Sequence, residues 1–224
     1  MAVSLLQRLA DVPVVFLDVE TTGASAQYGD RVIELGICRV EGGVKVRTYD
    51  KLLDPQRRIT AGVTALTGIS NDMVAGQPRF AEELPEILSI LDGAVIVGHN
   101  VRFDLSFLNG EFRRTGKTIV DALGDRHVLD TVRIARRRFG RGGNGLQRVC
   151  RNFGYEPDVA HRALADVHTT IHVFEKLLEP AGVWGLSLCD AMMQQGGPMG
   201  LLPASPKESL LPLELEEALE GGRP

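Results

Sequence analysis

The chain has 224 residues, of which 44% are hydrophobic and 24% charged, values typical of a folded globular protein. No stretch approaches the ~20 apolar residues of a membrane-spanning helix, and a formal net charge of −4 argues against non-specific coating of nucleic acid. The three cysteines lie far apart without a C-x-x-C pair, so free thiols are expected. The N-terminal segment lacks the basic region of a signal peptide, which predicts a cytoplasmic protein with no membrane partner.

The first part of the chain predicts a strand-rich unit. An apolar run of β-formers over residues 13–19 predicts a buried strand. Residues 32–40 alternate well enough for a second strand, and a Gly-Gly turn leads into a third over residues 44–53. These three segments together predict a meander.

Helices and short strands are predicted to follow. Residues 63–91 have helical spacing in pieces, with Ser70 as a cap and Pro85 as a position where a helix starts late or kinks. Residues 94–98 form a short apolar strand, and residues 101–115 predict a helix.

The second half of the chain repeats this alternation of strands and helices. Residues 127–131 predict a fifth strand, and helices are predicted over residues 145–154 and 163–178. We expect one domain over residues 1–190 and a flexible, Pro/Gly-rich acidic tail over residues 191–224.

Two segments have alternative interpretations. The tail segment 209–220 places apolar residues among acids, which suits either a short amphipathic helix on a partner or an acidic segment without a binding role. Between Arg133 and Arg151 the chain carries seven arginines and no acid. This pattern suits either a solvated helix face or a local phosphate-binding surface.

The first strand ends in two carboxylates, Asp18 and Glu20. Residues i and i+2 of a strand point to one face, so these acids project together and repel each other. A divalent cation would remove that conflict, and carboxylate oxygens suit Mg²⁺ or Mn²⁺.

Three further polar residues support a metal site at this pair of acids. Asp104 follows the strand at 94–98 in the first turn of a helix, where it is either a dipole partner or a metal ligand. His161 precedes the long helix, and Asp166 lies in its early turns among small and apolar neighbours. A buried carboxylate needs a partner, which is either a metal ion or an arginine such as Arg162.

The stretches DVETTG, HNVRFD and HRALAD begin at residues 18, 99 and 161. In this order they resemble the DEDDh branch of the DnaQ-like 3′→5′ exonucleases, over roughly three quarters of the chain. The form of the first stretch and of residues 59–74 is most similar to bacterial polymerase-linked proofreading exonucleases. The resemblance implies an α/β, ribonuclease H-like, three-layer fold in which helices flank a five-stranded mixed sheet.

The resemblance also implies roles for these residues. Asp18 would bridge two Mg²⁺ or Mn²⁺ ions, Glu20 and Asp166 would complete the site of the attacking water, and Asp104 would hold the second ion. His161 would be the general base. The chemistry agrees, because two ions supply a hydroxide and stabilise the phosphorane and the leaving oxygen, and an imidazole accepts a proton near neutral pH.

Substrate contacts follow from the same resemblance. Thr21, Thr22 and Gly23 would let the backbone approach the terminal nucleotide, and Asn100 and Phe103 would lie beside the substrate strand. Leu66 and Ile69 would form an apolar wedge against the last bases, or are ordinary core residues.

The implied activity is release of 5′-mononucleotides from the 3′ end of DNA. The implied partners are a single-stranded 3′ end and the catalytic subunit of a replicative DNA polymerase, reached through the tail. Alternatives are a free-standing exonuclease that trims DNA or RNA 3′ ends in repair or RNA turnover, and a binding module that holds 3′ ends without cutting.

Overall fold

A computed structural model describes residues 3–157 and 161–201. Its core is a five-stranded mixed sheet in the order β3-β2-β1-β4-β5. β1 pairs antiparallel with β2 and β2 antiparallel with β3, whereas β4 runs parallel to β1 and β5 parallel to β4. The strands are β1 (Val14–Thr21), β2 (Val32–Glu41), β3 (Val44–Leu52), β4 (Val95–Gly98) and β5 (Val128–Asp130). The predicted fold class is confirmed.

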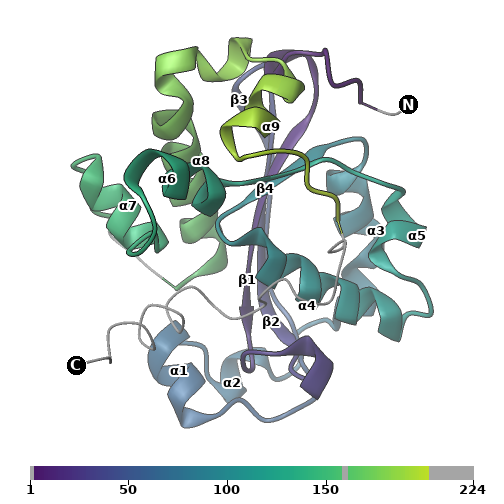
Figure 1. The fold of residues 1–224 in the computed structure, drawn as a ribbon. Helices are drawn as coiled ribbons and strands as arrows, with labels where there is room; N and C mark the ends of the chain where they lie inside the picture. The colour runs from purple at the N-terminus through teal and green to yellow at the C-terminus, as the bar shows by residue number, and fades with distance from the viewer. Residues whose placement is uncertain (1–2, 158–160, 202–224) are drawn as a thin grey trace.

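Helices cover both faces of the sheet (Figure 1), with α3 to α5 on one side and α6 to α9 on the other. The α-helices of the described residues are α1 (Ala61–Thr67), α2 (Asn71–Val74), α3 (Phe80–Leu91), α4 (Val101–Arg114), α5 (Ile119–Leu123), α6 (Thr131–Phe139), α7 (Leu146–Asn152), α8 (Ala163–Leu178) and α9 (Leu188–Gln194). Among these described segments, none forms a helix long and apolar enough to cross a membrane.

The alternation of β1 builds the three layers. Val15, Leu17 and Val19 point into the apolar cluster beneath α3, α4 and α5, while Val14 and Phe16 point into the cluster beneath α6, α8 and α9. Because successive side chains of a strand face opposite ways, a strand buried on both faces must be apolar throughout its length. β1 obeys this rule up to Leu17, and polar residues begin only where the strand leaves the core.

The local signals in the middle of the chain are mostly confirmed. The Ser70 hydroxyl accepts a hydrogen bond from the Met73 N–H and caps α2, as predicted. α3 begins at Phe80, five residues before Pro85, so the proline lies inside the helix rather than at its start. The short helices α5 and α9 were not predicted.

The expected boundary after residue 190 needs correction. α9 packs Leu188 and Met192 into the core, and Met199 and Leu201 are also buried. The Gln195 side chain accepts a hydrogen bond from the Asp130 N–H (2.8 Å) and donates one to the Val128 carbonyl (3.0 Å), which closes the open edge of β5. The folded unit therefore continues to residue 201, and the expected tail segment 209–220 lies outside the described residues.

Gly36 decides how closely α8 approaches the sheet. It lies in β2 directly opposite Asp18. A Cβ atom on this residue would lie 2.5 Å from the Ala163 carbonyl carbon and 2.5 Å from the Leu164 nitrogen. Only glycine therefore lets the first turn of α8 lie directly on β2, beside the polar end of β1.

We predict that Gly36→Ala displaces the first turn of α8, because the neighbouring atoms are backbone and cannot rotate away. The free energy of unfolding should fall by about 1–3 kcal/mol, the usual cost of overpacking. Gly62→Ala is the control, since that residue lies in α1 with only the Thr60 hydroxyl at 4.0 Å from the added Cβ. Thermal denaturation of the two variants checks the prediction, and equal stability would contradict it.

Candidate active site

A cavity of about 300 Å³ opens at the carboxyl ends of β1 and β4. In a parallel pair these ends meet at one edge of the sheet, where α/β proteins usually form their sites. Most of the residues singled out in the sequence line this cavity: Asp18, Glu20, Thr21, Gly23, Leu66, Asn100, Phe103, Asp104, His161 and Asp166.

Two of the predicted residues are placed elsewhere. Ile69 is fully buried and packs with Ile33, Ile59 and Val74 in a separate apolar cluster. Thr22 is also buried and serves the loop after β1, since its hydroxyl donates to Asp30 (3.3 Å) and accepts from the Arg31 N–H (3.0 Å). Neither belongs to the residues that line the described cavity.

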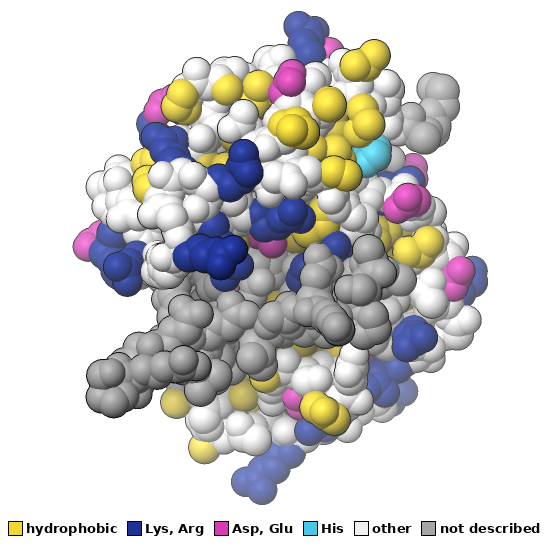
Figure 2. All heavy atoms as spheres, viewed as in Figure 1, with side chains coloured by type: hydrophobic (Ala, Val, Ile, Leu, Met, Phe, Trp, Pro, Cys, Tyr) yellow, Lys and Arg dark blue, Asp and Glu magenta, His cyan; other side chains and the backbone are white. Residues whose placement is uncertain are grey.

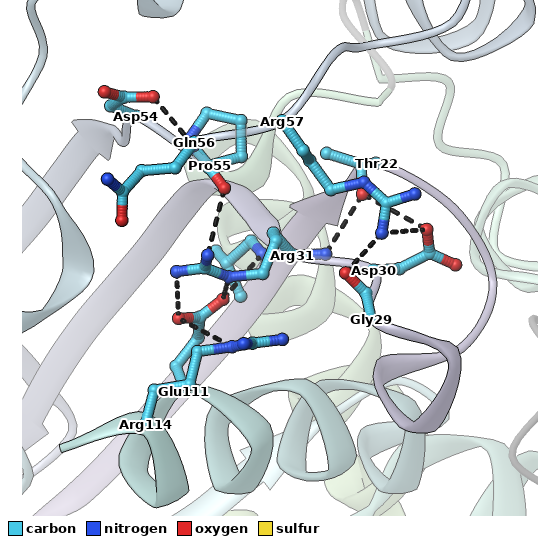
Figure 3. Close-up of polar contacts among 11 residues, drawn as sticks. Thr22, Gly29, Asp30, Arg31, Asp54, Pro55, Gln56, Arg57, Glu111 and Arg114 are labelled. Atoms are coloured by element: carbon cyan, nitrogen blue, oxygen red, sulfur yellow. Dashed lines mark hydrogen bonds and ion pairs between the residues drawn. The ribbon is translucent and has the colours of Figure 1, made fainter.

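The loop after β1 is held by a polar network around Arg31 (Figure 3). The Arg31 guanidinium donates to both carboxylate oxygens of Glu111 in α4, at 2.6 and 2.8 Å, and to the Pro55 carbonyl at 3.0 Å. Asp30 accepts a hydrogen bond from the Ser25 N–H at 3.1 Å. It also pairs with Arg57 at 3.2 Å (Figure 3). These contacts tie the loop to α4 and to the segment after β3.

Gly23 is required by this network. A Cβ atom there would lie 2.4–2.7 Å from the carboxylate atoms of Asp30. The glycine therefore leaves room for the Asp30 carboxylate to close the turn.

Asp18 and Glu20 continue the row of side chains that starts with Val14 and Phe16 on β1. Both acids are half-buried and face the layer of α8. Asp104 comes from α4 and is buried, and its Oδ1 accepts a hydrogen bond from the Val19 N–H at 3.0 Å. This bond fixes the third carboxylate against the strand that carries the first two.

Asp166 and His161 are coupled through the backbone. The Asp166 Oδ2 accepts a hydrogen bond from the His161 N–H at 2.9 Å, while Gln147 of α7 lies 3.5 Å from its Oδ1. His161 has φ of 59°, in the left-handed region that costs energy for a residue other than glycine. The carboxylate that faces the cavity therefore also holds the histidine in its unusual backbone conformation.

Glu34 anchors the same segment from the sheet. It is buried in β2, opposite Glu20 of β1. Its carboxylate binds the Arg162 guanidinium at 2.6–3.1 Å and accepts a hydrogen bond from the Ala163 N–H at 2.9 Å. The hydrogen bonds that Arg162 donates to Glu34 raise the pKa of Arg162. Arg162, considered above as a partner for Asp166, thus forms its ion pair with Glu34.

Glu34 caps the first turn of α8 from another element, and this role was not predicted from the sequence. The feature of the sequence that could have indicated this role is an acid inside the mostly apolar second strand. Together with Gly36, this residue sets where α8 begins, and hence where His161 and Asp166 lie.

The donor set fits a divalent cation. One ligand atom each from Glu20, His161 and Asp166 lie within 4.8 Å of one another, and Asp18 and Asp104 line the same cavity. Carboxylate oxygens are the preferred ligands of Mg²⁺ and Mn²⁺. Four acids in one cavity also repel one another strongly unless a cation lies between them.

Two titratable groups support the backbone around Asn100: the half-buried His99, which lines the cavity, and Asp130, which is buried behind it. His99 contacts the Thr131 hydroxyl (2.7 Å) and the Asn144 carbonyl (2.8 Å) through its two ring nitrogens, and burial lowers its pKa to about 4. Asp130 accepts hydrogen bonds from the N–H groups of Asn100 (3.0 Å) and Val132 (2.9 Å), while burial raises its pKa to about 6. Asn100 has φ of 62°, so Asp130 helps hold the left-handed residue from which α4 starts.

We predict that Asp130→Asn changes how stability depends on pH. The folded-state pKa of about 6 lies above the unfolded value of 3.8, so the native protein loses stability as pH rises through that window. The loss is on the order of 3 kcal/mol at most, and asparagine, which keeps an acceptor oxygen, does not suffer it. Melting temperatures from pH 4 to 7.5 should therefore improve for the variant relative to wild type as pH rises. A constant difference would contradict the prediction.

The mixed sheet with helices on both faces is a ribonuclease H-like fold, and four carboxylates and a histidine gather at the ends of its strands. The sequence profile of the exonuclease family RNase_T matches residues 15–174. The chain therefore belongs to this family of DnaQ-like 3′→5′ exonucleases.

Curated relatives support this assignment. The chain is 34% identical over 180 residues to DNA polymerase III subunit epsilon of Aquifex aeolicus, covering 80% of this chain and 86% of that one. It is 36% identical to 3′-5′ exonuclease DinG of Bacillus subtilis and 31% identical to DNA polymerase III PolC-type of Halalkalibacterium halodurans. These matches cover 74% and 95% of this chain, but it spans only 17% and 14% of those longer proteins.

Solved structures share the fold. Exonuclease X in complex with 5′ overhanging duplex DNA aligns with a TM-score of 0.58 at 20% identity, over 80% of this chain and 98% of that one. The nuclease domain of 3′hExo, a DEDDh family member bound to rAMP, aligns with a TM-score of 0.65 at 16% identity, over 78% and 94%.

Proposed function

We propose that this chain hydrolyses the last phosphodiester at the 3′ end of a DNA strand and releases 5′-mononucleotides, using two Mg²⁺ or Mn²⁺ ions. The observation that carries the proposal is the convergence of Asp18, Glu20, Asp104, Asp166 and His161 on one cavity. We further propose that it proofreads for a replicative DNA polymerase, with the C-terminal tail as the contact. The support is the match to a polymerase III epsilon subunit over 86% of its length.

The four carboxylates would hold the metal ions. When bound, two such ions supply an activated water, neutralise charge on the phosphorane and stabilise the leaving 3′ oxygen. Asp18 and Glu20 are presented by a rigid central strand, and Asp104 is fixed to that strand by the Val19 N–H. Such rigid placement suits the narrow geometric tolerance of two-metal chemistry.

His161 is proposed as the general base. It lines the cavity, and its side chain lies in the same cluster as Glu20 and Asp166. The imidazole would accept the proton of the attacking water while Asp166 holds the backbone of the histidine.

The other lining residues would hold the terminal nucleotides. Leu66 of α1 is 59% exposed yet lines the cavity, so its side chain is available to pack against bases. Phe103 of α4 also lines the cavity, and an aromatic face suits base stacking. Thr21, Gly23 and Asn100 offer backbone and small polar groups for the sugar and phosphate. Thr22 is proposed only as a support of the loop, and Ile69 is not carried forward.

The decisive measurement compares digestion of single-stranded DNA, single-stranded RNA and a duplex with a 3′ mismatch, all labelled at the 5′ end. We expect Mg²⁺- or Mn²⁺-dependent shortening from the 3′ end with 5′-mononucleotide products, and faster removal of the mismatched terminus than of a paired one. Activity in excess chelator, or shortening from the 5′ end, would refute the proposal. Preference for RNA would instead favour the free-standing trimming alternative, and binding without cutting would favour a module that holds 3′ ends.

We predict that His161→Ala lowers kcat by about 10²–10⁴-fold, the usual contribution of a general base, and leaves KM for a single strand near the wild-type value. His161→Gln should recover nothing, because an amide cannot accept the proton. Single-turnover rates and steady-state KM values for both variants provide the measurement. Wild-type turnover in either variant would remove the histidine from the mechanism.

A further inference from the structure

The arginines between residues 133 and 151 differ from those of the rest of the described chain. Elsewhere, most arginines lie within 4.0 Å of a carboxylate: Arg8, Arg31, Arg39, Arg47, Arg57, Arg114, Arg126 and Arg162. No carboxylate of residues 3–157 or 161–201 forms an ion pair with Arg137, Arg141 or Arg148. The sequence explains this, because no acid occurs between Thr131 and Tyr155.

These three arginines are exposed and lie on one unit of the fold. Arg137 belongs to α6, Arg141 to the connection that follows, and Arg148 to α7. Figure 2 shows Lys and Arg side chains gathered on the face over α6 and α7. We call Arg137, Arg141 and Arg148 the arginine surface. The chain has a net charge of −4, so this local excess of positive charge would attract an anionic ligand.

The arginine surface begins at the rim of the cavity. Leu146 and Gln147 of α7 line the cavity, and Arg148 is the next residue. The Asn144 carbonyl binds His99, another lining residue, so the connection between α6 and α7 is attached to the site. Gly143 has φ of 64°, and a Cβ there would lie 2.4–2.6 Å from the guanidinium of Arg148. The glycine thus lets the Arg148 side chain lie across the backbone of this connection.

An aromatic pair, the exposed Phe139 and the half-buried Phe153, adjoins the arginine surface. Phe139, which ends α6, is 41% exposed and packs edge-on against Phe153 with ring centroids 5.7 Å apart. Arg138 lies over both rings, at 5.6 and 5.2 Å, and donates to the carbonyls of Lys176 and Leu177 at the end of α8. Arginines beside exposed aromatic rings are typical of surfaces that bind single-stranded nucleic acid.

We propose that the arginine surface binds the phosphates of the substrate strand on the 5′ side of the nucleotides held in the cavity. The inference rests on the proposed function and adds to it a second binding region, which contacts backbone phosphates and reads no base sequence. Strands long enough to leave the cavity bind more tightly than oligonucleotides that only fill it. Affinity for the long strands falls steeply with salt.

The test uses Arg137→Ala/Arg141→Ala/Arg148→Ala in the full-length chain with Mg²⁺. kcat/KM is measured on trinucleotides and on single strands of about 20 nucleotides over a range of salt concentrations. Each lost phosphate contact flattens the log–log salt dependence by about 0.7, so the triple variant should lose about 2 from the slope. The loss of kcat/KM should be confined to the long strands and be similar for different base sequences.

The matched control is Arg8→Ala/Arg47→Ala/Lys51→Ala, which removes the same charge from the N-terminal segment and β3. If the arginine surface alone contacts the strand, this control retains the wild-type slope and length dependence. That result would exclude the change of net charge as the cause of the loss. An unchanged slope in the arginine-surface variant overturns the proposal and leaves an acidic protein partner for this surface. An equal loss on trinucleotides and long strands also overturns it. If wild type cuts neither substrate, the proposed function itself fails.

Discussion

Mutual repulsion among four carboxylates in one cavity is the constraint on which the rest of this structure depends. Asp18 and Glu20 share a face of β1, and Asp104 and Asp166 approach from helices on the two sides of the sheet. Charges of one sign at such short range destabilise the folded state unless a cation lies between them. The remaining fold must therefore hold each acid in place against its neighbours.

Backbone donors and an apolar frame provide that support. Val15, Leu17 and Val19 anchor β1 in one core, while Val14 and Phe16 anchor it in the other. The N–H of Val19 holds Asp104, and that of His161 holds Asp166. A carboxylate that accepts a backbone hydrogen bond gives up little conformational freedom when a cation binds, so the site is organised beforehand.

Two ion pairs join elements that are far apart in the sequence. Arg31 links the start of β2 to Glu111 in α4, and Arg162 links the start of α8 to Glu34 in β2. An ion pair with a fully buried carboxylate contributes little net stability, because the cost of desolvation offsets much of the attraction. Removing one partner is nevertheless costly, because the other charge then stays buried without a counterion. Their effect here is geometric, because each pair fixes a helix that carries a cavity carboxylate relative to the central sheet.

The sequence by itself determined the strands and the long helices, because those signals are local, and its resemblance to a known family supplied the catalytic candidates. An apolar run placed β1, alternation placed β2 and a Gly-Gly turn placed β3, while the two-residue period put Asp18 and Glu20 on one face. Only the tertiary structure decided that Ile69 is core, that residues 191–201 belong to the fold, and that Glu34 anchors Arg162. Those outcomes depend on pairing between positions as much as 128 residues apart, and no local period or spacing encodes such a contact.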